Sequence, residues 1–162
     1  MVMIRLEKGF TFVELMIVVV IVGILAGVTV PLGALWISQA RISGVEGEIA
    51  VAVGKAKGSA IRNQFGVVAN NPVTTICIDQ DGLLTVLEST AANLPSCDTA
   101  TGNEVWRTEL SSKVELSVGG NALACLCFNS IGVLTDTGCA SCELNNRLTL
   151  TSGSRSETVF LN

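Results

Sequence analysis

The N-terminal part of the chain carries an almost unbroken run of apolar residues. Residues 15 to 28 contain no polar side chain, and residues 15 to 40 carry no formal charge. A helix needs about 20 consecutive apolar residues to cross the roughly 30 Å hydrocarbon core of a bilayer. The pattern therefore predicts a membrane-spanning helix over residues 10–35. Arg5 and Lys8 precede the run, so we expect the N-terminus on the cytoplasmic side and the rest of the chain outside.

Helical periodicity continues through residues 36–66. Apolar residues recur there at spacings of three, four and seven, which predicts an amphipathic helix whose single apolar stripe packs on a sheet. Four glycines in this segment each weaken a helix by about 1 kcal/mol relative to alanine, which indicates either close backbone packing or a helix that needs support. The helix is expected to stop near Gln64 to Gly66. The stripe comprises Leu35, Ile42, Val45, Ile49, Ala52, Val53, Ala56, Ala60 and Ile61, and the glycines are Gly44, Gly47, Gly54 and Gly58.

Residues 67–162 change to short runs typical of β-strands, separated by turns. Asp81-Gly82 and Gly119-Gly120-Asn121 are hairpin signals. Ser89–Asn103, rich in serine, threonine, asparagine and proline, is expected to form a long surface loop. The predicted fold is α+β, with a long N-terminal α-helix packed on a C-terminal antiparallel β-sheet domain. The candidate strands are Val73–Asp79, Leu83–Glu88, Lys113–Val118, Leu123–Asn129, Gly132–Thr135, Arg147–Thr151 and Thr158–Leu161.

A specific motif stands at the start of the apolar run, where a basic segment ends in the string Gly9-Phe10-Thr11-Phe12-Val13-Glu14. A secretory signal peptide, a plain membrane anchor and a buried core helix are the alternatives for an apolar run. None of them accounts for the order of this string. It resembles the processing site of type IV pilins and pseudopilins. The resemblance implies that a membrane peptidase removes the leader, residues 1–9, by cutting between Gly9 and Phe10, and methylates the new amino group of Phe10.

Two further residues of the helix gain a role from this resemblance. Pro31 falls where pilins commonly carry a proline that loosens the helix. Glu14 is a lone carboxylate at the hydrocarbon edge, which costs about 2 to 3 kcal/mol on insertion scales, so it should seek a positive partner. We expect that partner to be the new amine of Phe10, in the same chain or in a neighbouring subunit. An intermolecular pair would set the register of each arriving subunit; the alternative is that Glu14 reaches the lipid headgroups.

The second half of the chain narrows the resemblance. Residues 56–64 followed by Val73–Cys77 are similar to the helix-to-strand passage of the GspH/FimT/FimU group of minor pilins and pseudopilins. Phe128–Gly132 resembles that group's aromatic-x-x-x-glycine turn, and Ser152–Arg155 resembles its C-terminal strand region. Ser154 interrupts the Gly-Arg pair of the group, which leaves the role of that loop open.

Six cysteines, at positions 77, 97, 125, 127, 139 and 142, suit an oxidising periplasm and up to three disulfides. A Cys77–Cys97 bond would close a loop of about 20 residues and stabilise the fold by about 3 kcal/mol in the chain-entropy model. Cys125 and Cys127 point to the same side of their strand, which favours the nested pairs Cys125–Cys142 and Cys127–Cys139. The alternatives are a zinc site made by the last four cysteines and redox catalysis by the Cys139-x-x-Cys142 motif, which lacks a histidine to stabilise a thiolate. No metal and no cofactor are expected.

Composition argues against catalysis and against nucleic-acid binding. The 162 residues carry a net charge of −4 and contain no histidine, so general acid–base chemistry has few candidates. After Lys113 only Arg147 and Arg155 are basic, which is not the footprint of phosphate binding. Asp79 and Asp81 stand in a hairpin signal and lack the later glutamate of a calcium loop.

The resemblance implies a structural function: a minor type IV pilin that starts or caps a pilus, with adhesion, twitching motility and DNA uptake as outcomes of the whole system. Its implied partners are the prepilin peptidase and methyltransferase, other minor pilins, the major pilin, an inner-membrane assembly platform and, before assembly, lipid. The implied location is the inner membrane, in a single pass, and then the pilus tip. Two alternatives are a minor pseudopilin of type II secretion and a DNA-binding competence pilin.

Overall fold

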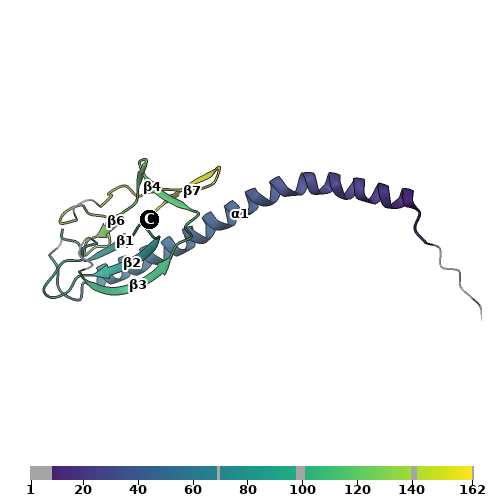
Figure 1. The fold of residues 1–162 in the computed structure, drawn as a ribbon. Coiled ribbons are helices and arrows are strands. Elements are labelled where there is room, and N and C mark those ends of the chain that lie inside the picture. The colour runs from purple at the N-terminus through teal and green to yellow at the C-terminus, as the bar shows by residue number, and fades with distance from the viewer. Residues whose placement is uncertain (1–8, 69, 98–100, 140–141, 162) are drawn as a thin grey trace, which may run out of the picture. The chain divides into compact units, whose positions relative to one another are not determined.

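The computed structural model describes residues 9–161 apart from 69, 98–100, 140 and 141; the side chains of residues 28–32 also lie outside the description. The chain divides into two units, Met1–Ile37 and Ser38–Asn162. The α+β prediction is confirmed, since in the described part of the chain the helix α1 (Phe12–Arg62) is followed by eight strands, all paired in the antiparallel sense (Figure 1).

The first unit contains the start of α1. Every large apolar side chain described from Phe10 to Leu25 is exposed. Over the described residues, no helix combines the length and the apolarity needed to cross a membrane. The membrane-spanning role of residues 10–35 therefore stays a prediction. α1 runs through position 31, but the side chain of Pro31 lies outside the description, so its loosening effect stays a prediction.

In the second unit, the remainder of α1 supplies one side of the hydrophobic core. The predicted stripe is confirmed at Ile42, Val45, Ile49, Ala52, Val53, Ala56 and Ala60, which are all buried. It is wrong at Ile61, which is 64% exposed, and at Leu35 in the first unit, which is 48% exposed.

The helix ends two residues before the predicted stop region. Arg62 is its last residue, and Asn63 adopts a positive φ of 38°, the left-handed conformation that closes many helices. The side chain of Asn63 accepts a hydrogen bond from the Val67 N–H at 2.8 Å and donates one to the Val67 carbonyl at 2.9 Å. An asparagine therefore makes the turn that the sequence analysis assigned to the residues after it.

The glycines on this part of α1 are not sites of close packing. A Cβ atom added to Gly44, Gly47, Gly54 or Gly58 would meet nothing within 4 Å. The close-packing alternative is therefore wrong for this chain by itself, and the four glycines lower the helix propensity without a compensating contact inside the subunit.

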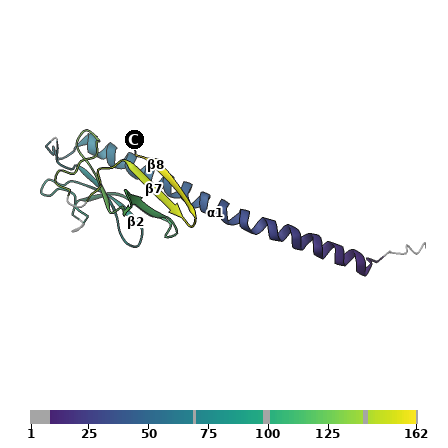
Figure 2. The same ribbon diagram turned by 90° about the horizontal axis from the view of Figure 1, so that it is seen from above.

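Two four-stranded sheets complete the second unit. One has the order β3-β2-β1-β6 and the other β5-β4-β7-β8 (Figures 1 and 2). The strands are β1 (Thr74–Ile78), β2 (Leu83–Glu88), β3 (Asn103–Glu109), β4 (Glu115–Val118), β5 (Asn121–Ala122), β6 (Cys125–Phe128), β7 (Arg147–Ser152) and β8 (Arg155–Phe160).

The predicted strands need four corrections. The sequence analysis missed β5, which pairs with β4 across the Gly119-Gly120 turn; the predicted hairpin partner Leu123–Asn129 instead contains β6, which lies in the first sheet and pairs with β1. The sequence analysis missed β3, because Glu104, Arg107 and Glu109 interrupt its apolar residues; as an edge strand it leaves these charges exposed. Gly132–Thr135 is not a strand and contributes one isolated bridge, Phe128 to Leu134. The last strand begins at Arg155, earlier than the predicted Thr158, because a two-residue turn with Gly153 at φ 61° joins it directly to β7.

The hairpin predicted between the first two strands is confirmed. Gly82 adopts φ 81°, which glycine tolerates without strain. The Asp79 Oδ1 atom accepts hydrogen bonds from the N–H groups of Asp81 and Leu83 at 3.0 and 2.8 Å. This carboxylate is therefore engaged by the turn.

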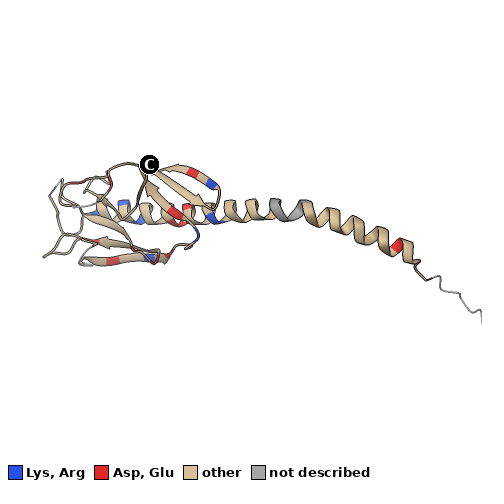
Figure 3. Ribbon diagram, turned by 45° about the horizontal axis from the view of Figure 1, so that its top comes forward, with Lys and Arg blue, Asp and Glu red and all other residues tan. Residues whose placement is uncertain are grey.

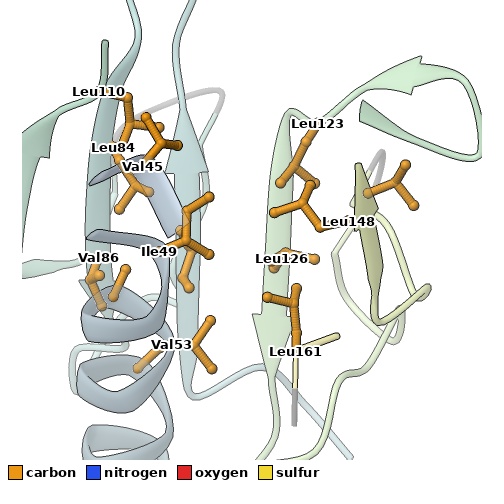
Figure 4. Close-up of a cluster of buried hydrophobic side chains, with 14 of the residues drawn as sticks. Val45, Ile49, Val53, Leu84, Val86, Leu110, Leu123, Leu126, Leu148 and Leu161 are labelled. Carbon is orange, nitrogen blue, oxygen red and sulfur yellow. The ribbon is translucent and has the colours of Figure 1, made fainter. Parts of the chain in front are cut away.

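The core lies between α1 and the sheets. Val45, Ile49 and Val53 of α1 face leucine and valine side chains of the strands and their connections (Figure 4). In the first sheet the core-facing residues include Ile76 of β1 and its cross-strand partner Leu126 of β6. Because side chains alternate along a strand, the residues next to Ile76 in β1 and next to Leu126 in β6 point to the opposite face of this sheet. That opposite face carries cysteines.

Candidate functional site: the processing segment and the disulfide face

The predicted cleavage site lies in an exposed, non-helical segment. Gly9 and Phe10 precede the first helical residue, and Phe10 is 91% exposed. A protease must bind its substrate in an extended form, so a scissile bond outside the helix is accessible to it. The basic residues Arg5 and Lys8 lie outside the described residues.

Thr11 and Glu14 form a reciprocal cap at the start of α1. The Thr11 N–H donates to Glu14 Oε2 at 2.9 Å, and the Thr11 hydroxyl donates to the same oxygen at 3.0 Å. In return the Glu14 N–H donates to Thr11 Oγ1 at 3.3 Å. This is a capping box, which satisfies N–H groups that the first turn of a helix leaves without partners.

The sequence analysis missed the role of Thr11. The signal was present, because Thr-x-x-Glu directly before an apolar run is the sequence signature of a capping box. The structure also gives Glu14 a partner within its own chain, besides the amine that the sequence analysis proposed. The carboxylate is held one helical turn from the predicted cleavage site.

The cysteines occupy the face of the first sheet that points away from the core. Cys77 of β1 pairs across the ladder with Cys125 of β6, and Thr75 pairs with Cys127. The structure joins the three pairs named in the sequence analysis, with Cα–Cα distances of 5.5, 4.7 and 6.5 Å for Cys77–Cys97, Cys125–Cys142 and Cys127–Cys139. The first bond ties the loop after β2 to β1, and the other two tie the segment after β6 back to β6.

The two nested disulfides are in contact with each other. The sulfur of Cys127 lies 3.5 Å from that of Cys142, to which it is not bonded. The Thr75 hydroxyl lies 3.2 Å from the Cys127 sulfur and 4.0 Å from the Cys139 sulfur. A cavity of about 350 Å³ reaches this group and is lined by all six cysteines together with other residues such as Asp79 and Pro95.

One buried carboxylate was not singled out by the sequence. Glu88, the last residue of β2, is only 5% exposed, and its Oε1 atom has no hydrogen-bond partner among the described residues. Glu88 pairs across the ladder with Thr74, whose hydroxyl donates to the Ala56 carbonyl of α1 at 3.0 Å. Nothing in the local pattern Leu83–Glu88 distinguishes this glutamate from an exposed strand end.

The N-terminal region matches the family model of the prokaryotic N-terminal methylation motif over residues 4–30. Fimbrial protein Q of Moraxella bovis is 37% identical over 93 residues, which cover 56% of this chain and 56% of that protein. The type IV major alpha-pilin of Moraxella bovis is 48% identical over 44 residues, covering 27% of this chain and 28% of that protein. Fimbrial protein EcpB of Eikenella corrodens is 35% identical over 78 residues, covering 48% of this chain and 44% of that protein. No solved structure matches the chain.

The chain spans about half the length of the first of these relatives and less of the other two. The matched motif and the relatives confirm the resemblance to type IV pilins on which the sequence analysis relied. The narrower resemblance to the minor group stays a prediction.

Proposed function

We propose that this chain is a minor pilus subunit that starts or caps the filament. Its methylation motif and its relatives support membership of the type IV pilin family. The observation that carries the proposal is the N-terminal segment. An exposed Gly9–Phe10 bond is followed at once by a capped helix whose large apolar side chains are exposed from Phe12 to Leu25. Such a helix is suited to packing among the helices of other subunits.

The first step of the proposed life cycle is processing. Before assembly the apolar helix is held in the inner membrane. The prepilin peptidase cuts between Gly9 and Phe10 and the new amine of Phe10 is methylated. The capping box fixes where the helix begins, so it keeps the scissile bond outside the helix while the peptidase acts.

Glu14 then takes part in assembly. After cleavage the amine of Phe10 lies next to Thr11, whose N–H and hydroxyl already donate to the Glu14 carboxylate. An amine arriving from a neighbouring subunit would replace the neutral Thr11 donor at Glu14 by a charged donor. Charge-assisted hydrogen bonds are roughly twice as strong as those between neutral groups. The exchange of partners at Glu14 would fix the register of the incoming subunit, with Pro31 loosening the helix farther along.

The second unit would provide lateral contacts with other minor subunits and with the major pilin. Its charges of both signs are interspersed over α1 and the strands (Figure 3). This distribution gives no support to binding of nucleic acid, for which a basic stripe is typical. The proteins similar to the chain are named as fimbrial proteins and a pilin, which supports a pilus over a type II secretion system.

Processing is tested by the intact mass of the protein isolated from the cell envelope. The wild-type chain should begin at Phe10 and carry one extra methyl group. Gly9→Leu places a bulky side chain at the scissile bond and should leave the leader attached. Gly44→Leu is the matched control, because it adds the same side chain at an open helix position and should be processed normally. A wild-type chain that keeps residues 1–9 would contradict the proposal.

A further inference from the structure

Three of the six sulfur atoms form a close group on the disulfide face. The sulfurs of Cys127, Cys139 and Cys142 all lie within 4.8 Å of one another, although only Cys127 and Cys139 are bonded within this trio. Cys127 therefore has two sulfur neighbours, its bonded partner and the Cys142 sulfur at 3.5 Å. A contact at that distance is within reach of a thiolate that attacks a disulfide.

We propose that these cysteines form a thiol–disulfide exchange site, in which Cys127 moves from Cys139 to Cys142 and releases Cys125. The substrate class is a small thiol or the thiol of an oxidoreductase. The site lies in the cavity of about 350 Å³ that the cysteines line, Cys139 among them. Cys142 is partly exposed there, and Cys125, Cys127 and Cys139 are buried, with Cys139, at 8% exposure, the least covered of these three.

The exchange begins when an external thiolate attacks the Cys139 sulfur. A mixed disulfide forms between the external sulfur and Cys139, the Cys127–Cys139 bond breaks, and Cys127 leaves as a thiolate. The Thr75 hydroxyl, 3.2 Å from the Cys127 sulfur, is placed to donate a hydrogen bond to that thiolate. A hydrogen bond to the charged form stabilises it.

The second step is internal. The Cys127 thiolate attacks the Cys142 sulfur, a Cys127–Cys142 bond forms, the Cys125–Cys142 bond breaks, and Cys125 leaves as a thiolate that takes a proton from water. One disulfide is exchanged for another, so this step needs no oxidant or reductant. The segment after β6 remains covalently tied to β6 throughout, because one bond between them exists at every stage.

The variant Cys139→Ser, studied as the full-length chain in detergent micelles, tests the internal step directly. It leaves Cys127 without its partner, beside the intact Cys125–Cys142 bond. After incubation at mildly alkaline pH, the free thiol is trapped with N-ethylmaleimide and located by fragment-ion mass spectrometry. We expect label on both Cys125 and Cys127, with at least roughly one chain in ten carrying Cys127–Cys142, the fraction that corresponds to about 1.4 kcal/mol between the two isomers.

The matched control is Cys142→Ser, which also leaves one free thiol. That thiol is on Cys125, which is not a member of the trio, so the label should stay on Cys125 and the Cys127–Cys139 bond should persist. Label confined to Cys127 in the Cys139→Ser variant would overturn the proposal. Equal scrambling in both variants would also overturn it, because exchange would then reflect unfolding.

The wild-type chain provides a second measurement, which stays informative if a variant misfolds. The oxidised protein is treated with less than one equivalent of dithiothreitol, quenched with acid and mapped. Exchange predicts Cys127–Cys142 among the partially reduced chains. The presence of only the two native bonds of this segment would overturn the proposal.

Discussion

At the scale of single residues, Thr11 and Glu14 show how one side chain serves two purposes. Glu14 accepts two hydrogen bonds from Thr11 in the isolated chain, and in the proposed filament it would accept a charged amine. The apolar run pointed to the helix, and the motif pointed to Glu14. The role of Thr11 was not predicted, although its three-residue spacing to Glu14 is the signature of a capping box. Glu88 escaped the sequence analysis because burial of a strand end depends on what packs over it.

Removal of the Thr11 hydroxyl should loosen the first turn of α1. Thr11→Val is expected to destabilise that turn by about 1 kcal/mol, because a helix cap is lost. Hydrogen exchange at the amides of Val13 to Leu15, in micelles, measures the change. Thr11→Ser restores the hydroxyl and should restore protection, and Ser43→Val, at an exposed site within the helix, should leave these amides unaffected. Equal protection in the Val and Ser variants of Thr11 would contradict the cap.

Neutralisation of Glu88 should stabilise the second unit. The carboxylate is buried and its Oε1 atom has no partner among the described residues, so Glu88→Gln removes the cost of burying a charge. We expect the free energy of unfolding to rise by about 1 kcal/mol. Thermal unfolding measures the shift, with the exposed Glu109→Gln as a control that should change little. A lower stability of Glu88→Gln would mean that the carboxylate has a stabilising partner.

At the scale of elements, the sequence predicted the helix and the strands whose residues keep one regular pattern or are bounded by a clear turn signal. The buried stripe of α1 followed a helical period, and β1 and β2 were flanked by a clear turn signal. The edge strand β3 was missed because charged residues occupy positions that no neighbour covers. Gly132–Thr135 was predicted as a strand from its composition, but Asn129 Oδ1 accepts from the N–H groups of Ile131 and Val133 and folds the segment into a turn.

Replacement of the open glycines of α1 by alanine should stabilise the subunit, whereas the same replacement of a turn glycine should destabilise it. Gly47→Ala and Gly54→Ala are each expected to stabilise the unassembled subunit by about 0.5 to 1 kcal/mol, because alanine favours the helix and meets nothing within 4 Å. Gly66→Ala should destabilise it, because Gly66 has a positive φ of 64°. Thermal unfolding in detergent measures all three. A loss of stability at Gly47 and Gly54 would show that these positions are packed after all.

At the scale of the whole molecule, the exposed helix of the first unit and the core of the second unit serve different tasks. The second unit has its own core, and three disulfides hold its loops to the first sheet. The two nested pairs were predicted from the strand period, since Cys125 and Cys127 are two residues apart and share a face, and the Cys77–Cys97 pair was predicted from the loop that it closes. The pattern alone did not show the contact between the two nested bonds, because such a contact depends on how the intervening segment folds back.

The outer disulfide should be a measurable part of this stability. The double variant Cys77→Ser, Cys97→Ser opens a loop of about 20 residues and is expected to lose about 3 kcal/mol of unfolding free energy in the chain-entropy model. Denaturant unfolding of the oxidised proteins measures the loss. An unchanged midpoint would show that the loop after β2 is held by its other contacts.

The central claim is that the chain is cut at Gly9–Phe10 and built into a pilus. The most direct measurement is mass spectrometry of filaments sheared from the surface of the native cell, searched for an N-methylated peptide that begins at Phe10. The proposal predicts this peptide at low abundance beside a major pilin. Processed protein found only in the cell envelope, with none in the filaments, would contradict it.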